Sequence, residues 1–359
     1  MKEWNGTWEE AIDIQAKNWF EPEHTLLFDI ETTGLSPRNS MVYMIGYCYF
    51  NSQWNYRILF NDDGRSEYAI LSEFLSVLKD FTTILHFNGD HFDVPYLVEK
   101  CRQYQSLGLP LSNTDALNAC TSLDLYKVIK PYRNGLSLPN LKLQTLEKAL
   151  GINRMDTYNG GELIQVYHKY LNKPSDAMEH LLFQHNYEDI KAMIPMLSLL
   201  NFQGLASHSW DLKDILQGKQ EYKLLLQLNN PLPIRYICNT PNYSFHGFEY
   251  EAVITIPIVQ EELKYFLADW KDYYYLPIED KVIHKSIAAY VDNSCKEKAK
   301  KSNAYIKKEG RFLAIPSKMK SLTLHIYKHN YADTEQYVEL TDIEKKSSDF
   351  WLNYINCLF

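Results

Sequence analysis

The sequence predicts an α/β domain, built on a mixed sheet with helices on its faces, followed by a smaller α+β domain. Strand-like and helix-like segments alternate up to about residue 200, and the region begins with three successive strand-like segments. Beyond a connection at 201–210, strand-like runs return together with short helical ones. With 359 residues the chain is long enough for two cores. We therefore divide it into an N-terminal arm at 1–22, a first domain at 23–205 and a second at 206–359.

The elements of the first domain follow from the spacing of their apolar residues. Short apolar or alternating runs predict strands, and apolar residues three and four apart predict helices. The arm is expected to pack on this domain as a short helix or an irregular segment. The expected strands are 25–32, 41–50, 55–60 and 82–88, and the expected helices are 94–104, 141–150, 161–171 and 177–200.

Composition and charge exclude several classes of protein. The chain is 45% hydrophobic, but its longest apolar run, near 41–50, is far shorter than the ~20 residues of a membrane-spanning helix. The acidic N-terminus does not resemble a signal peptide. Six cysteines without a CxxC pair indicate neither a disulfide framework nor a thiolate zinc site, so we expect a cytoplasmic protein. A net charge of −8 argues against coating nucleic acid by charge alone.

Acidic residues lie at or shortly after the ends of two expected strands. In "LLFDIETTGL", Asp29 and Glu31 lie two apart and so point to the same face of a strand. In "LHFNGDHFDVPYL", Asn88 follows a strand and Asp93 begins a helix. Each pattern has an ordinary alternative: a solvent-facing strand end for the first and a helix cap for Asp93.

A third unusual pattern lies in the helix around "FQHNYEDIKAM". His185 and Asp189 occupy the apolar stripe of this helix, between Leu182 and Met193. Burying a carboxylate costs several kcal/mol unless it is paired or bound to metal. The alternative is a His–Asp pair that satisfies itself. Three such patterns together favour one shared site, because converging carboxylates repel each other unless divalent cations lie between them. Oxygen ligands select Mg²⁺ or Mn²⁺, and two such ions are the usual apparatus for hydrolysing phosphodiesters.

"FDIETTGL", "FNGDHFD" and "HNYEDIKAM", in this order, resemble the three motifs of the DEDD (DnaQ-like) superfamily of 3′–5′ exonucleases, most closely its YprB-like branch. The resemblance covers about residues 23–200. It implies a ribonuclease H-like fold with a five-stranded mixed sheet, two bound cations (Mg²⁺ or Mn²⁺), and release of nucleotides from the 3′ end of single-stranded DNA or RNA. Carried over by position, the metal-binding acids are Asp29, Glu31, Asp93 and Asp189, and the general base is His185.

The histidine departs from the family pattern. A tyrosine base usually precedes the last aspartate with three residues between, and a histidine base with four, whereas His185 has the tyrosine spacing. Residues i and i+4 still share a helix face, and an imidazole pKa of about 6.5 suits a base. The resemblance further places Thr32, Thr33 and Leu35 against the terminal nucleotide and Asn88 at a substrate-binding position. It also matches Asp124 to a family-branch position, with a helix cap as the alternative.

The second domain contains no catalytic motif but is locally basic. Residues 281–320 hold 11 Lys and Arg against 3 Asp and Glu, a balance of +8. The run 295–301 is helix-compatible, and 304–316 is expected to be a basic hairpin with interleaved aromatic residues. Such surfaces suit single-stranded nucleic acid, so Lys298, Lys300 and Lys301 are candidate substrate contacts, with a solvated basic face as the alternative.

Two other functions remain open: a nucleic-acid-binding protein with a decayed site, and a structure-specific endonuclease. The sequence does not decide between DNA and RNA, and it predicts no oligomeric state.

Overall fold

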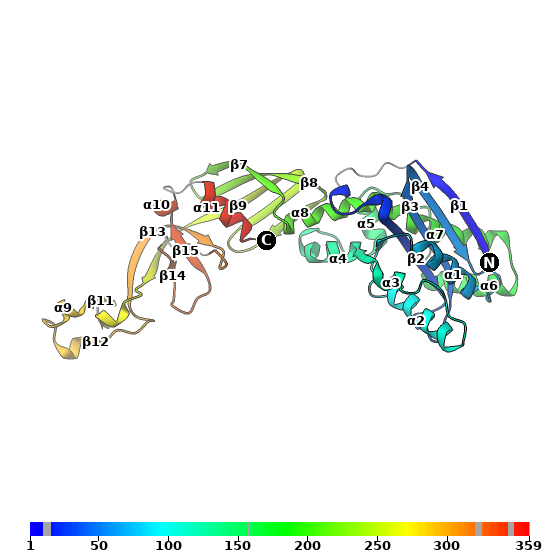
Figure 1. Cartoon of the computed structure of the whole chain (residues 1–359). Coiled ribbons are helices and arrows are strands. Elements are labelled where there is room, and N and C mark those ends of the chain that lie inside the picture. The colour runs from blue at the N-terminus through cyan, green and yellow to red at the C-terminus, as the bar shows by residue number, and fades with distance from the viewer. Residues whose placement is uncertain (10–15, 157, 159, 320–324, 344–347, 359) are drawn as a thin grey trace. The chain divides into compact units, whose positions relative to one another are not determined.

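The computed structural model describes residues 1–9, 16–156, 158, 160–319, 325–343 and 348–358 (Figure 1). The chain divides into two compact units, which are described separately below. The first unit contains Met1–Gln203 and Asn230–Tyr236, and the second contains Gly204–Asn229 and Ile237–Phe359. Within the described residues, no helix is both long enough and apolar enough to cross a membrane.

A mixed six-stranded sheet forms the centre of the first unit, with the order β1-β4-β3-β2-β5-β6. The first four are antiparallel neighbours, while β5 and β6 run parallel to β2. The mixed α/β architecture and the four predicted strands are confirmed. The strands are β1 Lys2–Trp8, β2 Thr25–Thr32, β3 Val42–Asn51, β4 Gln53–Phe60, β5 Thr83–His86 and β6 Thr121–Asp124.

The sheet has one strand more than the expected five, because part of the N-terminal arm forms β1. Its sequence KEWNGTW alternates, and Trp4, Gly6 and Trp8 are less exposed than Asn5 and Thr7. Trp8 stacks on Tyr56 with the ring centres 4.6 Å apart and donates a hydrogen bond to the Tyr187 hydroxyl at 2.8 Å. Two tryptophans at even spacing thus pair this segment with β4. Residues 10–15 of the predicted arm lie outside the described residues.

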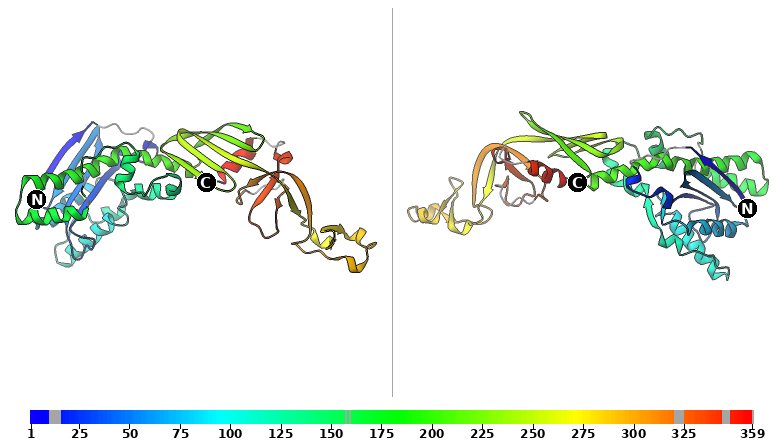
Figure 2. Two further views of the ribbon diagram at one scale, coloured as in Figure 1. Left: turned by 180° about the vertical axis from the view of Figure 1, so that it is seen from behind. Right: turned by 45° about the horizontal axis from the view of Figure 1, so that its top comes forward.

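Helices cover both faces of this sheet (Figures 1 and 2). Leu26, Phe28 and Ile30 of β2 belong to the core packed against α1 and α2. Alternate residues of a strand point to opposite faces, so Asp29 and Glu31 face the other side, where α7 contacts β2 and β3. The helices of this part are α1 Glu67–Leu78, α2 Asp93–Ser106, α3 Ala116–Ala119, α4 Leu125–Ile129, α5 Leu143–Ala149, α6 Gly160–Asn172 and α7 Asp176–Met196, and the short α8 Gln203–Ala206 spans the boundary to the second unit.

The second unit is built on antiparallel sheets with short helices. Its larger sheet has the order β13-β15-β14-β9-β8-β7, and a three-stranded sheet has the order β11-β10-β12. The strands are β7 Trp210–Gln217, β8 Glu221–Asn239, β9 Ser244–Phe266, β10 Tyr273–Leu276, β11 Lys281–His284, β12 Glu297–Lys298, β13 Tyr305–Ile315, β14 Tyr327–Lys328 and β15 Gln336–Glu339, and the helices are α9 Lys285–Ala288, α10 Leu340–Ile343 and α11 Ser348–Asn356.

Two local predictions for this unit are wrong. The segment 304–316 is no hairpin: β13 runs through Glu309 and Gly310 and pairs with β9 from Tyr305 to Leu313. Gly310 does not adopt the positive φ that tight hairpin turns require. The helix-compatible run 295–301 contributes a 3-10 turn and β12 rather than a helix. In both places a neighbouring strand offers backbone hydrogen bonds that local sequence does not reveal.

Candidate active site

Asp29 and Glu31 lie on β2 beneath α7, and neighbouring side chains hold both carboxylates. Asn186 of α7 donates from Nδ2 to Asp29 Oδ2 at 3.1 Å. The Tyr43 hydroxyl donates to Glu31 Oε2 at 3.3 Å. Gly46 of β3 is the pairing partner of Asp29 on β2. Because it has no side chain, it leaves the space that Asn186 fills. The period-two spacing of the acids thus directs both into one polar layer between sheet and helix.

Asp93 is the first residue of α2, and a hydrogen bond and close packing fix the loop before it. Asn88 has a φ of 62°, and its N–H donates to Asp124 Oδ1 at 2.8 Å. A Cβ at Gly89 would lie 2.6 Å from the His86 ring and 2.9 Å from Asp93 Oδ2. Asp124 also caps α4 by accepting from the Tyr126 N–H. This aspartate is therefore a helix cap that also fixes the loop leading to Asp93.

His185 and Asp189 project from α7 toward Glu31. His185 Nε2 lies 3.3 Å from Glu31 Oε1 and 3.4 Å from Asp189 Oδ2. The ligand atoms of these three residues all lie within 4.8 Å of one another. The i, i+4 spacing places His185 and Asp189 on one face of the helix, and that face meets the polar layer of the sheet.

Burial and repulsion by neighbouring acids disfavour the charged forms of Asp29, Glu31 and Asp93. Burial, together with the charges of Asp189, Asp93 and Glu31, raises the pKa of Asp29 well above its ordinary value. Burial likewise raises the pKa of Glu31 to about 7 and that of Asp93 to about 7. The four acids therefore form one electrostatic cluster. A buried set of carboxylate oxygens that repel each other fits hard divalent cations, and these four residues would hold them.

Two residues of the site were missed by sequence reasoning, Arg154 and Asp156, from the segment between α5 and α6. Arg154 Nη1 lies 2.5 Å from Asp189 Oδ1 and 3.2 Å from Glu147 Oε1, and its Nη2 lies 3.2 Å from Asp156 Oδ2. Asp156 Oδ2 in turn is hydrogen-bonded to His185 Nδ1. These residues lie in a loop without periodicity, so no local pattern in the sequence marks them.

The acids around His185 decide its protonation. Burial alone would lower the pKa of the His185 ring, but Asp189 and Glu31 oppose this, as does the hydrogen bond to Asp156. The net effect raises the pKa of His185 above its ordinary value. An imidazole in this position is well suited to take up a proton.

Comparison with known proteins places this region in a family. Residues 26–201 match the model of the RNase_H superfamily. This part of the chain is a ribonuclease H superfamily domain. The match confirms the predicted fold and indicates a nuclease. No curated protein matches the chain by sequence.

Several solved structures resemble the chain at low identity. The family B DNA polymerase of the archaeon Pyrobaculum calidifontis is 13% identical over 70% of this chain and 35% of its own, with a TM-score of 0.40. An ExoI/SSB-Ct complex is 15% identical over 62% and 54%, with a TM-score of 0.33. E. coli exonuclease I with a dT13 oligonucleotide is 12% identical over 93% and 69%, with a TM-score of 0.35. The chain thus spans about a third of the first of these proteins and about half of the second.

Three predicted substrate contacts of the ribonuclease H domain lie at the end of β2 and in the loop after it. Thr32 is buried, and its hydroxyl donates to the Gly34 carbonyl at 2.9 Å, while the Thr33 hydroxyl accepts from the Met41 N–H at 3.0 Å. Both threonines therefore shape the loop. Leu35 at its tip is 86% exposed and free to contact a ligand. The three lysines, Lys298, Lys300 and Lys301, belong to the second unit and are exposed there.

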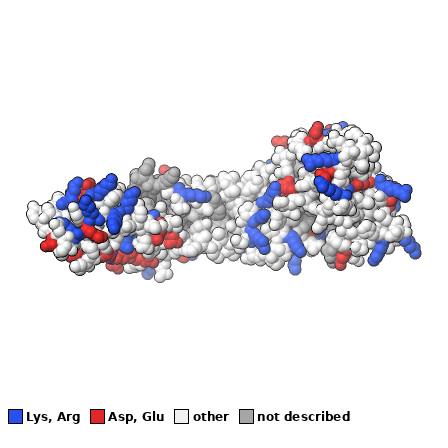
Figure 3. Space-filling view, turned by 90° about the horizontal axis from the view of Figure 1, so that it is seen from below, with Lys and Arg blue, Asp and Glu red and all other residues white. Residues whose placement is uncertain are grey.

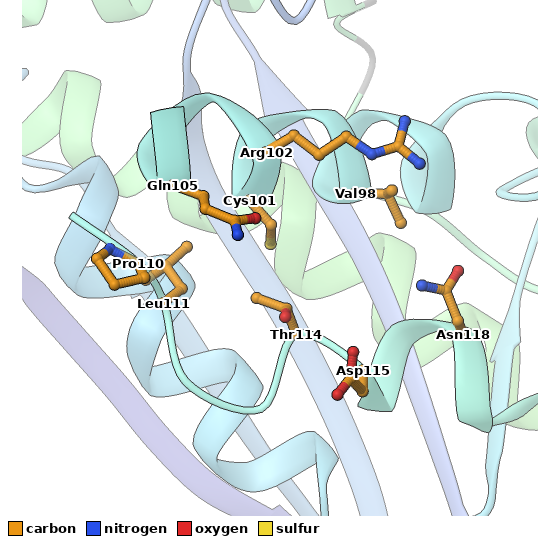
Figure 4. Close-up of a pocket in the computed structure, with 9 residues that line it drawn as sticks. All are labelled: Val98, Cys101, Arg102, Gln105, Pro110, Leu111, Thr114, Asp115 and Asn118. Atoms are coloured by element: carbon orange, nitrogen blue, oxygen red, sulfur yellow. The ribbon is translucent and has the colours of Figure 1, made fainter. Parts of the chain in front are cut away.

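Two other features of the ribonuclease H domain lie outside this site. His86, Asp90 and Asp124 also have ligand-like spacing. Protein groups already engage them: His86 meets Ser122 at 2.8 Å and Asp90 meets Lys127 at 2.5 Å. A hollow of about 240 Å³ opens between α2 and residues 110–118. It is lined in part by Arg102 and Asp115, and Figure 4 shows that it contains none of the predicted site residues.

Proposed function

We propose that this protein is a 3′–5′ exonuclease that hydrolyses the terminal phosphodiester of single-stranded nucleic acid. One observation carries the proposal: Asp29, Glu31, Asp93 and Asp189 form one cluster of buried and half-buried acids with His185, inside a ribonuclease H superfamily domain. The chain order and spacing of these residues also resemble the DEDD exonucleases, although His185 keeps the tyrosine-type spacing. All six cysteines are free thiols, which suits the expected cytoplasmic location.

The four acids would hold two divalent cations, Mg²⁺ or Mn²⁺. When bound, such ions lower the pKa of water and stabilise the charge of the leaving oxygen. They would also offset the burial and the repulsion that together raise the pKa of Asp29. Asn186 and Tyr43 would keep the Asp29 and Glu31 carboxylates oriented for this task through the hydrogen bonds described above.

His185 is the proposed general base. Its Nε2 faces Glu31 and Asp189, so a water molecule bound among these acids would lie within reach of the ring. Nε2 takes a proton of that water while the water oxygen forms a bond to the phosphorus of the terminal phosphodiester. The bond from this phosphorus to the 3′ oxygen of the preceding nucleotide breaks in line, and that oxygen takes a proton from solvent. A nucleoside 5′-monophosphate leaves, the shortened strand keeps a 3′-hydroxyl, and His185 returns its proton to solvent.

One observation favours a second function. Arg154 Nη1 lies against Asp189 Oδ1, an oxygen that a cation would otherwise use. An arginine held there would suit a decayed site that binds nucleic acid without cleaving it. The two functions differ in what Arg154 does when cations are supplied. In an active exonuclease, Arg154 would leave this oxygen or share Asp189 with a cation. In a decayed site, it would stay. A structure-specific endonuclease would keep the same acids but would cut within the strand.

The deciding experiment is hydrolysis of 3′- and 5′-labelled single-stranded DNA and RNA with Mg²⁺, Mn²⁺ or EDTA. Asp29→Asn removes a proposed ligand, and Asp176→Asn, an exposed acid at the start of α7, is the matched control. We expect metal-dependent release of mononucleotides from the 3′ end by the wild type and the control, but not by Asp29→Asn. Internal fragments would indicate an endonuclease, and binding without cleavage would indicate the decayed site.

A further inference from the structure

We propose that Asp156 is a positioning residue that holds the His185 ring with its proton on Nδ1, which leaves Nε2 as the basic nitrogen. The inference rests on the proposed function for its catalytic meaning. The hydrogen bond itself can be tested without any activity.

The chemistry of Asp156 and His185 decides which of the two donates the hydrogen bond between them. A carboxylate has no proton to give, so His185 Nδ1 donates and Asp156 Oδ2 accepts. Arg154 Nη2 lies 3.2 Å from this same oxygen and 3.2 Å from Nδ1. Because a guanidinium can only donate, and Nδ1 already carries a proton, the Arg154 hydrogen bond goes to Asp156. Asp156 Oδ2 thus receives two donors, and its side chain is only 3% exposed.

The other oxygen of Asp156 and its backbone are also held. Asp156 Oδ1 accepts from the Tyr158 N–H at 3.0 Å, and Glu188 Oε2 accepts from the Asp156 N–H at 2.9 Å and from the Met155 N–H at 3.1 Å. The carboxylate is therefore anchored from several sides before any ligand arrives. Such preorganisation is what a group that orients a base needs.

This arrangement accounts for the unusual spacing of the histidine. His185 stands one turn before Asp189 on the same helix face, so the ring lies beside the proposed metal ligand. Nothing on α7 itself hydrogen-bonds to Nδ1 in the described residues. The segment after α5 supplies that partner from outside the helix. Arg154 links the two acids, because it contacts Asp156 through Nη2 and Asp189 through Nη1.

The first measurement is the ¹⁵N NMR signal of the His185 ring in the full-length, metal-free protein, at a pH where the ring is neutral. The signal is assigned by its absence in His185→Gln. We expect the wild-type ring to be protonated at Nδ1. A ring protonated at Nε2 would overturn the proposal. This result needs no hydrolysis, so it stands even if the proposed exonuclease activity fails.

The second measurement compares Asp156→Asn with Met155→Ala. Asp156→Asn should change the ring tautomer and lower kcat by about 10-fold to 100-fold or more, with KM and Mn²⁺ affinity within about twofold. Met155→Ala alters the same segment at a side chain that is 85% exposed, so its kcat should stay within about threefold of the wild type. Equal losses in both variants, or a loss of Mn²⁺ affinity matching the loss of kcat, would assign Asp156 a purely structural role and overturn the proposal.

Discussion

Gly46 of β3 makes room for Asn186 of α7: a Cβ at position 46 would lie 2.0 Å from Asn186 Oδ1. The same amide donates its hydrogen bond to Asp29. A glycine on a buried strand is therefore tied to the orientation of a proposed metal ligand. The absence of one methyl group allows the helix to approach the sheet closely enough for the two polar layers to meet.

Gly46→Ala should consequently destabilise the protein and weaken the proposed metal site. Overpacking of this kind costs about 1–3 kcal/mol, and displacing Asn186 removes the hydrogen bond to Asp29. We expect a lower free energy of unfolding in urea and a higher Kd for Mn²⁺ by calorimetry. Gly160→Ala is the control, because a Cβ there meets nothing within 4 Å.

A second variant separates the two effects. Gly46→Ala combined with Asn186→Ala relieves the clash but does not restore the hydrogen bond. This pair should recover stability without recovering Mn²⁺ affinity. Full affinity in either variant would mean that Asn186 does not orient Asp29.

The sequence predicts which site residues lie together only where a strand or a helix imposes a regular period. The strand period of two places Asp29 and Glu31 on one face, and the helix period does the same for His185 and Asp189. Arg154 and Asp156 were not predictable, since their contacts come from an irregular segment whose path no period constrains. The same limit explains β1 and β13: their pairing depends on a distant strand, whereas local sequence in 304–316 favours a turn.

The buried acids predict a characteristic pH dependence of stability for the metal-free protein. The pKa of Glu31 and that of Asp93 are raised to about 7, whereas the pKa of such groups in an unfolded chain is about 4. Between these values the folded state binds more protons than the unfolded state, so the free energy of unfolding falls as the pH rises. The contribution of these two groups to the free energy of unfolding is fully present below about pH 4 and is lost by about pH 7 to 8.

Urea unfolding with EDTA across this pH range tests the prediction. Asp93→Asn removes one such group, so its stability should fall less steeply with pH than that of the wild type. Asp176→Asn, which alters an exposed acid, should follow the wild type. Mg²⁺ at about 100 times its Kd should add about 2.7 kcal/mol at neutral pH. Parallel profiles for wild type and Asp93→Asn would contradict the buried-acid account.

A buried ion pair supports the loop that follows the first acidic motif. Lys100 Nζ lies 3.0 Å from Glu67 Oε1, which also accepts from the Val42 N–H at 2.7 Å. Lys100 donates as well to the Ser40 carbonyl. Lys100→Met would leave the Glu67 carboxylate buried and uncompensated, so we expect a loss of about 3–5 kcal/mol in urea unfolding.

The double variant Glu67→Gln with Lys100→Met decides what the pair contributes. A glutamine oxygen can still accept from the Val42 N–H, and no unpaired charge is left. Most of the lost stability should therefore return. A double variant as unstable as Lys100→Met alone would show that the lysine acts through packing and its bond to Ser40 rather than through the charge of Glu67.

The exposed lysines of the second unit give a prediction about binding. Figure 3 shows Lys and Arg side chains gathered at the end of this unit that carries β10, β11 and β12. Several are engaged: Lys285 pairs with Asp272 at 2.6 Å and Lys307 with Asp280 at 2.6 Å. The described residues show no ion pair for Lys298, Lys300 or Lys301, and all three are exposed, so their charges are available to a phosphate backbone.

Replacing Lys298, Lys300 and Lys301 with Glu should weaken the binding of single-stranded oligonucleotides and flatten its salt dependence. Each lost phosphate contact reduces the slope of log K against log salt by about 0.7, so the full set should reduce it by about 2. Fluorescence anisotropy with an Asp29→Asn background prevents cleavage during the titration. The control replaces Lys213, Lys219 and Lys223 with Glu, which changes the net charge equally elsewhere in the same unit. If both triple variants flatten the slope alike, net charge rather than this surface governs binding, and the three lysines are a solvated basic face.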